Sequence, residues 1–275
     1  MTTPLRITTR NSTFQQLFSL RTNRQKRSST RTFLLEGVQP LNLALSHGWH
    51  VDALIHAAGK RLSDWANDIL ASHSSATRYV MSQPLLAELS GKDEPSELIA
   101  VVAARERSLA QLTVQPDLLL VAADRPANPG NLGTLIRSCD AFGADALVVT
   151  GHAVDVYDPA TITASRGSLF ALPVIRLASH RELLDWVTTV RQTLGTCHVV
   201  GADESGSLDV ERHDFTTPTV VIVGNEASGL SQGYREACDV LVRIPMSGAA
   251  SSLNVSVAAS VLLYEAVRQR RQRLP

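Results

Sequence analysis

The segment at residues 244–256 combines small side chains with polar groups that could bind a ligand. It reads IPMSGAASSLNVS, so an apolar strand end leads into a loop of Gly, Ala and Ser that also carries Ser252 and Asn254. Small side chains let backbone amides and carbonyls approach a ligand closely. A plain strand-to-helix connection with a serine N-cap would share these features. The segment therefore becomes informative only together with other motifs.

A glycine turn with one carboxylate follows an apolar run earlier in the chain. Residues 220–230 read VVIVGNEASGL, which places Glu226 between Gly224 and Gly229. The glycine spacing is that of a phosphate-binding P-loop, but the lysine that such a loop needs is missing. The turn therefore argues against an ATPase and leaves a carboxylate at the end of a buried strand.

A third motif, NPGNLGTLIR at residues 128–137, follows the apolar run at 118–123. It places the amide of Asn131 and the guanidinium of Arg137 six positions apart near the start of one predicted helix. A guanidinium suits bidentate recognition of a phosphate. Alone, the motif would also describe an ordinary turn whose arginine solvates a helix face.

The three motifs in this order resemble the SpoU family of the SPOUT class, which are S-adenosylmethionine-dependent RNA 2′-O-ribose methyltransferases. The matching positions are Asn131, Gly133 and Arg137, then Gly224, Glu226 and Gly229, and then residues 244–256. The resemblance covers residues 117–270, over half of the chain. Each motif is weak by itself, and the ordered set is specific.

The resemblance implies a role for each matched position. The cofactor-binding residues would be Ala202, Gly224, Ile244, Met246 and Leu253, acting mainly through main-chain groups. The catalytic residues would be Arg137, Asn131, Glu226, Ser252 and Asn254. Arg137 is either a general base or a clamp on the phosphate beside the target ribose, and the clamp is favoured because a guanidinium scarcely deprotonates. Ser252 either joins the site or caps the last helix, and Glu226 holds either side chains or turn amides.

The resemblance also suggests a substrate. The phrases at residues 155–159, 167–170 and 264–270 are similar to the branch of the family that methylates a uridine of large-subunit ribosomal RNA and confers resistance to an antibiotic that targets the ribosome. A transfer-RNA 2′-O-methyltransferase of the same family is the nearest alternative. An RNA-binding module without catalysis is another, against which the intact polar residues argue.

From residue 117 onward, predicted strands alternate with predicted helices. We expect strands near 118–123, 145–150, 173–177, 197–202, 219–224 and 239–244, and helices near 130–142, 159–166, 180–194, 230–237 and 252–271. This pattern predicts an α/β domain at 117–275 with a mostly parallel sheet covered on both faces and a ligand at the carboxyl ends of the strands. The resemblance adds a trefoil knot and a homodimer formed through this domain.

Residues 1–104 predict a smaller α/β domain, joined through a linker at 105–116. We expect helices at 13–27, 40–46, 61–72 and 84–89, and strands at 32–35, 51–56, 78–81 and 98–103. By resemblance to other SpoU proteins, this domain is expected to bind the RNA substrate.

The net charge of zero hides a strong segregation of charge. No acidic residue precedes Glu36, whereas seven basic residues do, and four arginines, among them Arg273, lie in the last eight residues. The residues between hold fifteen basic against 26 acidic groups. Such segregation is expected where an anionic polymer binds. We therefore predict RNA contacts at Arg21, Arg24, Lys26 and Arg27, although an acid-poor beginning would also fit a transit peptide.

Several classes of protein do not fit the sequence. No apolar run is long enough to cross a membrane, and no signal peptide is evident, so no membrane partner is expected. The eight histidines and three cysteines lack metal-ligand spacing, which predicts no metal site. The cysteines are expected to be reduced thiols of a cytoplasmic protein.

Overall fold

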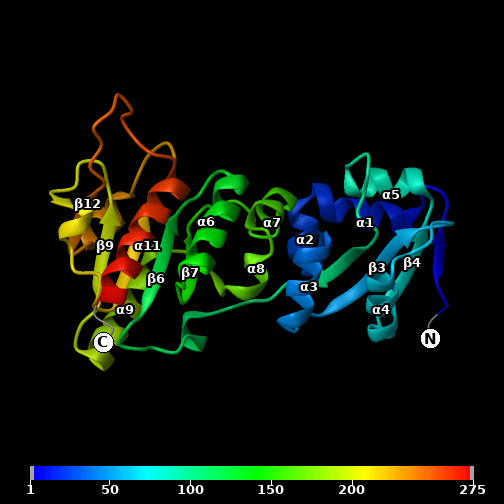
Figure 1. Cartoon of the computed structure of the whole chain (residues 1–275), viewed down its shortest axis with the longest axis horizontal. Helices are drawn as coiled ribbons and strands as arrows, with labels where there is room; N and C mark the ends of the chain where they lie inside the picture. The colour runs from blue at the N-terminus through cyan, green and yellow to red at the C-terminus, as the bar shows by residue number, and fades with distance from the viewer. Residues whose placement is uncertain (1–2, 273–275) are drawn as a thin grey trace. The chain divides into compact units, whose positions relative to one another are not determined.

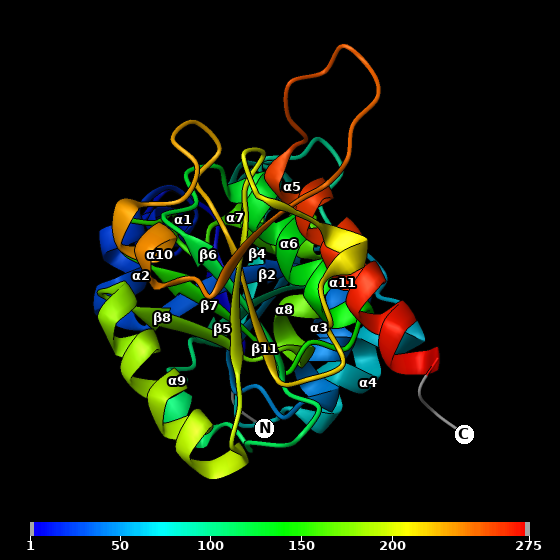
Figure 2. The same cartoon turned by 90° about the vertical axis from the view of Figure 1, so that its left-hand side faces the viewer.

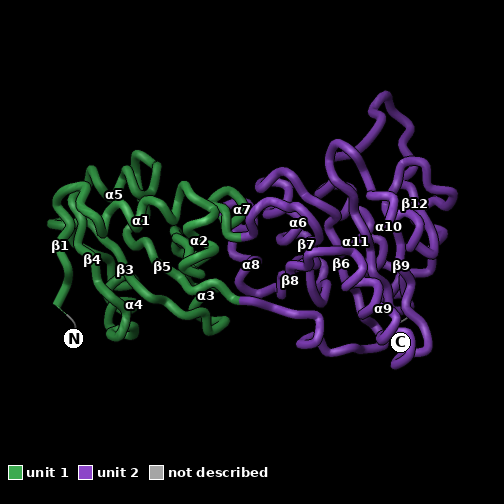
Figure 3. The backbone as a smooth tube through the Cα atoms, turned by 180° about the vertical axis from the view of Figure 1, so that it is seen from behind, with its two compact units in different colours: residues 1–105, 157–162 green, residues 106–156, 163–275 purple. Residues whose placement is uncertain are grey.

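The computed structural model describes residues 3–272 and divides the chain into two compact units (Figure 3). Unit 1 comprises Met1–Arg105 with Tyr157–Ile162, and unit 2 comprises Glu106–Val156 with Thr163–Pro275. Residues 106–116 of the expected linker are part of unit 2, and Leu109 among them is only 7% exposed and belongs to its core. Arg273 of the basic tail lies outside the described residues.

Unit 1 contains a five-stranded sheet in the order β1-β4-β3-β5-β2. Its strands are β1 (Leu5–Ile7), β2 (Thr32–Glu36), β3 (Val51–Ala57), β4 (Thr77–Met81) and β5 (Ile99–Ala103). β1, β4 and β3 run parallel, whereas β5 is antiparallel to both of its neighbours. Its helices are α1 (Ser12–Thr22), α2 (Arg24–Thr30), α3 (Val38–Ser46), α4 (Asp64–Ser72) and α5 (Gln83–Ser90) (Figure 1). β1 was not expected, because three residues carry too little alternation to be noticed.

The expected helix at 13–27 is two helices, because Asn23 interrupts it. Asn23 is extended, with φ −125° and ψ 110°, and its side-chain oxygen accepts a hydrogen bond from the Lys26 amide at 3.1 Å. An asparagine in this conformation is a favourable N-cap, so it ends α1 and starts α2. The apolar face of α1 is buried through Phe14, Leu17 and Leu20.

A short segment from the middle of the chain completes unit 1. The ring of Tyr157 stacks on Phe33 with centroids 4.5 Å apart and meets the edge of Trp49 at 6.3 Å. Its hydroxyl donates a hydrogen bond to the carbonyl of Arg105 at 2.9 Å. Stacked aromatic rings and a satisfied hydroxyl explain why residues 157–162 pack within this unit.

Unit 2 contains a seven-stranded sheet in the order β10-β12-β9-β11-β6-β7-β8, with every pair parallel. The strands are β6 (Leu119–Asp124), β7 (Ala146–Thr150), β8 (Val174–Leu177), β9 (His198–Ala202), β10 (Leu208–Asp209), β11 (Thr219–Val223) and β12 (Val240–Arg243). Its helices are α6 (Pro129–Ala141), α8 (Ser168–Ala171), α9 (His180–Leu194), α10 (Gln232–Ala237) and α11 (Val255–Gln272), and α7 (Pro159–Ser165) crosses the unit boundary. The prediction of an α/β fold with a parallel sheet is confirmed.

Helices cover this sheet on both faces, which explains its continuous apolar strands (Figure 2). Every residue of β6 and β11 is buried. Side chains of one face, such as Leu120 and Ile222, share a core with Val187 of α9 and Tyr234 of α10. Helices α6 and α11 pack against one another on the other face.

The connection from β12 to α11 is a long exposed loop that projects beyond the sheet (Figure 2). The last helix was expected to begin at residue 252, but it begins at Val255. The side-chain oxygen of Asn254 accepts hydrogen bonds from the amide of Ser256 at 3.0 Å and from its hydroxyl at 2.6 Å. Asn254 therefore caps α11, and the possibility that Ser252 does so is wrong.

Candidate active site and cofactor cavity

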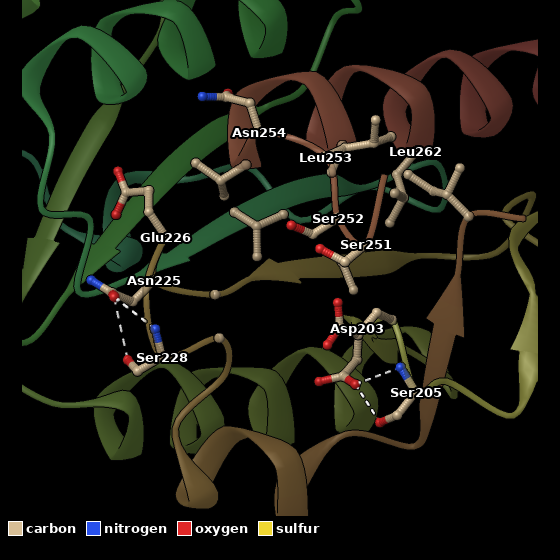
Figure 4. Close-up of a pocket in the computed structure, with 18 of the residues that line it drawn as sticks. Asp203, Ser205, Asn225, Glu226, Ser228, Ser251, Ser252, Leu253, Asn254 and Leu262 are labelled. Carbon is tan, nitrogen blue, oxygen red and sulfur yellow. Dashed lines mark hydrogen bonds between the residues drawn. The ribbon is translucent and has the colours of Figure 1, made fainter. Parts of the chain in front are cut away.

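A cavity of about 750 Å³ lies at the carboxyl ends of β9, β11 and β12 (Figure 4). The first residues of α6 and α11 complete its wall. A volume of this size suits a cofactor or small ligand, and the carboxyl edge of a parallel sheet is where such sites occur. The predicted residues that line the cavity are Asn131, Ala202, Gly224, Glu226, Ile244, Met246, Ser252, Leu253 and Asn254.

Glu226 joins the turn after β11 to the start of α6. Its carboxylate accepts hydrogen bonds from the Ala127 amide at 3.1 Å, the Asn128 amide at 3.2 Å and the side chain of Asn131 at 3.0 Å. Unpaired amides at a helix N-terminus attract a negative charge. Glu226 thus holds a side chain, as one alternative expected, and the backbone amides that it binds lie before α6 and not in its own turn.

These hydrogen bonds also keep Glu226 ionised. Loss of hydration at the cavity wall would raise the pKa of its carboxyl group, but donation from Asn131 and the amides of Ala127 and Asn128 outweighs this effect. The pKa of Glu226 therefore lies below its usual value. An anion with a lowered pKa is a good acceptor of hydrogen bonds and a weak base near neutral pH.

The side chain of Asn131 connects Glu226 to Asn254 through two hydrogen bonds. Its side-chain nitrogen donates to Glu226, while its oxygen accepts from the side-chain nitrogen of Asn254 at 3.0 Å. The oxygen of Asn254 in turn binds Ser256. Three elements, the turn after β11, α6 and α11, are thereby connected through one chain of side chains. Such a fully paired network fixes the orientation of each amide.

Gly224 is required by its own turn. A Cβ at this position would lie 2.3 Å from the carbonyl carbon of Gly229 and 2.5 Å from the amide nitrogen of Leu230. Contacts this short would force the backbone to move. The space that a Cβ of Gly224 would fill is thus taken by the returning backbone of the turn.

The opposite wall of the cavity carries an ion pair that the sequence analysis did not assign to the site. The guanidinium of Arg235 binds the carboxylate of Asp203, which also accepts a hydrogen bond from the amide of Ser205 at 2.9 Å. Burial would raise the pKa of Asp203, but the bonds from Ser205 and Arg235 lower it. The strand end at residue 202 was the only signal for this wall, since Arg235 belongs to no recognised motif.

Arg137 does not line the cavity, although Asn131 on the same helix does. Six residues correspond to about 9 Å of rise and roughly 120° of rotation around an α-helix, so the two side chains leave α6 in different directions. Arg137 is exposed and makes no ion pair with any residue between 3 and 272. A single chain thus places four of the predicted catalytic residues together and leaves Arg137 apart.

The predicted RNA contacts have different surroundings within unit 1. Arg24 is exposed, whereas Lys26 and Arg21 are half-buried, and Arg21 donates to the carbonyl of Glu88 at 2.9 Å. Arg27 is only 5% exposed and donates to the carbonyl of Leu20 at 2.9 Å. Its burial contradicts the predicted RNA contact. A buried arginine is stable here because carbonyls and Asp158 satisfy its donors.

The described part of the chain lacks two features of other protein classes. Residues 3–272 contain no group of His, Cys, Asp or Glu side chains that could hold a metal ion. No helix in that range has the length and apolar character needed to cross a bilayer. Cys139 and Cys197 are buried free thiols, and Cys238 is a half-buried one.

Fold and cavity together define an α/β protein that binds a ligand at the carboxyl edge of a parallel sheet, beside a network of Asn and Glu side chains. The model of the SpoU rRNA methylase family matches residues 118–264. The SpoU L30e-like domain matches residues 11–100. The chain therefore belongs to the SpoU rRNA methylase family, as its three motifs predicted, and it is a methyltransferase.

Individual members of the family match nearly the whole chain. The 23S rRNA (uridine(2479)-2′-O)-methyltransferase of Streptomyces viridochromogenes is 47% identical over 266 residues, which are 96% of this chain and 92% of that protein. The crystal structure of the SpoU methyltransferase AviRb from the same organism, in complex with AdoMet, has a TM-score of 0.89 at 47% identity and covers 95% of this chain and 99% of its own. An AdoMet-bound rRNA methyltransferase from Sinorhizobium meliloti has a TM-score of 0.86 at 29% identity, with 98% of both chains covered.

Proposed function

We propose that the protein transfers a methyl group from S-adenosylmethionine to the 2′-hydroxyl of a uridine in large-subunit ribosomal RNA. The observation that carries the proposal is the match, at 47% identity over 96% of this chain, to a protein named for that reaction. The cavity supports it, because side chains from all three family motifs line one wall. The fold alone would not suffice, since one fold serves many chemistries.

The residues of the cavity fit the proposed cofactor. The cavity is large enough, and Met246 and Leu253 keep 39% and 38% of their surface exposed beside it, so an apolar part of a ligand has side chains to contact. Carboxylates of Asp203, Glu204 and Glu226 outnumber the guanidinium of Arg235 in the wall, which suits a ligand with a net positive charge. When bound, S-adenosylmethionine supplies an electrophilic methyl group on a sulfonium.

The chain's own residues orient the nucleophile. A ribose hydroxyl is a weak nucleophile, so in-line alignment and removal of its proton are the main requirements. Asn131 and Asn254 present oriented amides at the cavity. In this proposal Arg137 holds the phosphate next to the target ribose, and the proton leaves to that phosphate or to water. Arg137 is exposed on α6 and makes no ion pair within residues 3–272, which leaves its guanidinium available for an anionic ligand.

Pairing of two chains over α6 and α11 is part of the proposal. Val257 and Tyr264 on α11 are 48% and 59% exposed, and the ring of Tyr264 meets Phe142 edge-on at 6.4 Å. Exposed apolar side chains in one area favour an interface, and most oligomers are homodimers. Because Arg137 lies on α6, such an interface would place a second chain beside it. The trefoil knot implied by the family would involve the last strands and α11.

The proposal also assigns RNA binding to unit 1, a cytoplasmic location to the protein and resistance to an antibiotic as a consequence. Unit 1 would bind RNA through Arg24, Lys26 and their neighbours, in keeping with its match to an L30e-like domain of SpoU proteins. We place the protein in the cytoplasm, where ribosomal RNA is modified. Modification of a drug-binding nucleotide would confer resistance, which growth at increasing concentrations of ribosome-targeting antibiotics would reveal.

Methyl transfer from tritiated S-adenosylmethionine to purified RNA tests the function. We expect label in 23S ribosomal RNA and none in transfer RNA, and primer extension at low nucleotide concentration should stop at one uridine. Label in transfer RNA alone would establish the alternative enzyme of the family. Binding of cofactor and RNA without label in either would indicate a module that only binds RNA.

A further inference from the structure

Asp124 and Arg125, at the carboxyl end of β6, form a paired unit to which the proposed reaction assigns no role. Asp124 is 4% exposed, and both of its carboxylate oxygens accept from the guanidinium of Arg125, from Nε to Oδ1 at 3.0 Å and from Nη2 to Oδ2 at 3.0 Å. Arg125 has a φ of +52°, which is unfavourable for a residue with a Cβ. Such a conformation persists only where its surroundings enforce it, and it is frequent at functional sites.

The unusual conformation allows the dipeptide to bind one turn at three points. The side-chain nitrogen of Asn225 donates to the carbonyl of Arg125 at 2.7 Å. The guanidinium of Arg125 donates to the carbonyl of Gly229 at 3.3 Å. The amide of Ser231 donates to Asp124 at 2.7 Å. The segment from 225 to 231, which carries Glu226, is therefore fixed near its start, middle and end.

The neighbouring strand leaves room for this arrangement. Gly151 follows β7 with a φ of +70°, and a Cβ there would lie 3.0 Å from Cγ of Arg125. The amide of Arg125 donates to the carbonyl of Thr150 at 3.1 Å. The ends of β6 and β7 thus leave space for the aliphatic part of the Arg125 side chain.

We propose that Arg125 is a positioning residue, which holds the turn at 224–229 so that Glu226 reaches Asn131 and the wall of the cofactor cavity stays closed. Arg125 itself does not line the cavity, whereas residues 224–229 all do. The inference rests on the cofactor assigned under the proposed function, and it does not depend on which RNA is methylated.

Replacement of Arg125 by lysine tests the role, because lysine keeps a positive charge beside Asp124 but lacks the planar fork that binds two partners. We expect the Kd for S-adenosylmethionine, measured by calorimetry, to rise about fivefold, the equivalent of one lost hydrogen bond. Hydrogen exchange at the amides of Ala227 and Ser228 should become faster, while the melting temperature stays near that of the wild type. Arg181→Lys, at an exposed position on α9, is the matched control and should change none of these.

A second variant keeps the proposal testable if the first one misfolds. Glycine adopts a positive φ without penalty, so Arg125→Gly preserves the backbone and removes the guanidinium. It is combined with Asp124→Asn, because the carboxylate would otherwise be left buried without its partner. The double variant should lose affinity for the cofactor at least as strongly as Arg125→Lys.

Two results would overturn the positioning role. One is an unchanged Kd with unchanged amide exchange in both variants. The other is a loss of affinity that follows the melting temperature in proportion, which a purely structural residue would produce. If the wild type binds S-adenosylmethionine but methylates no RNA, the proposed function fails and this test remains valid.

Discussion

At the scale of single residues, the site is organised around carboxylates that accept hydrogen bonds. Glu226 gathers two amides and Asn131, and Asp124 gathers an arginine and the amide of Ser231. Both carboxylates therefore hold segments of backbone in place. The group left to contact the substrate is a cation, Arg137, which the chain does not pair with any described acid.

Arg137→Ala is expected to abolish methyl transfer while leaving cofactor binding nearly intact. A donor aimed at the reacting group contributes about 100-fold or more to turnover, and Arg137 lies outside the cofactor cavity. Single-turnover methylation and calorimetric titration with S-adenosylmethionine measure the two effects separately. Arg181→Ala serves as the control. Equal loss of turnover and cofactor affinity would contradict the assigned role.

Glu226→Gln is expected to destabilise the protein in a pH-dependent manner. The lowered pKa of Glu226 means that its stabilising effect is fully present above the unfolded-state pKa of about 4.3 and is lost as the pH falls through the lower folded-state value. Glutamine places an NH₂ group opposite amide donors, which lowers the free energy of unfolding by about 1 kcal/mol. Urea unfolding should therefore show a difference between wild type and variant that is constant above about pH 5 and shrinks on acidification. A difference independent of pH would show that ionisation of Glu226 does not matter.

At the scale of elements, the turn between β11 and α10 is the most constrained part of the site. Gly224→Ala would push a methyl group to 2.3 Å from the backbone of Gly229. We expect a loss of about 1–3 kcal/mol in the free energy of unfolding, together with weaker cofactor binding, because the turn must open. Gly143→Ala is the control for a glycine away from the site, since nothing lies within 4 Å of a Cβ there. Its φ of +68° means that this control reports the backbone strain of alanine without a steric clash. Equal stability of Gly224→Ala and wild type would contradict the tight closure of this turn.

The elements also show what the sequence could and could not predict. Long apolar strands such as β6 and β11 were recognisable, because burial on both faces removes polar alternation. The break at Asn23 and the start of α11 at Val255 depend on which asparagine caps a helix, and composition does not decide that. Family motifs located Glu226, Asn131 and Asn254. Asp203–Arg235 and Asp124–Arg125 escaped notice, because their pairing depends on the path of the backbone.

At the scale of the whole molecule, the lysines are confined to one of the two units. All three lysines, Lys26, Lys60 and Lys92, lie in unit 1, and the acid-free beginning of the chain lies there too. Most arginines of unit 2 up to residue 272 are bound to carboxylates or carbonyls, as in the pairs with Asp124 and Asp203. An RNA held mainly by unit 1 would leave the chemistry to unit 2, in which Arg137 makes no ion pair with any residue between 3 and 272.

This division predicts how binding of RNA responds to salt. Neutralising Arg24 and Lys26 together should reduce the slope of log K against log salt by about 1.4–1.8, since each phosphate contact contributes about 0.7–0.9. Lys60 and Arg61 are also exposed in unit 1, and their double alanine variant is the matched control. Arg27→Ala should instead lower the melting temperature without changing the slope, because Arg27 is buried. Filter binding between 50 and 200 mM salt measures the slope for all three variants. If only the Lys60 and Arg61 variant changes the slope, the RNA-binding surface lies at the carboxyl end of β3 instead.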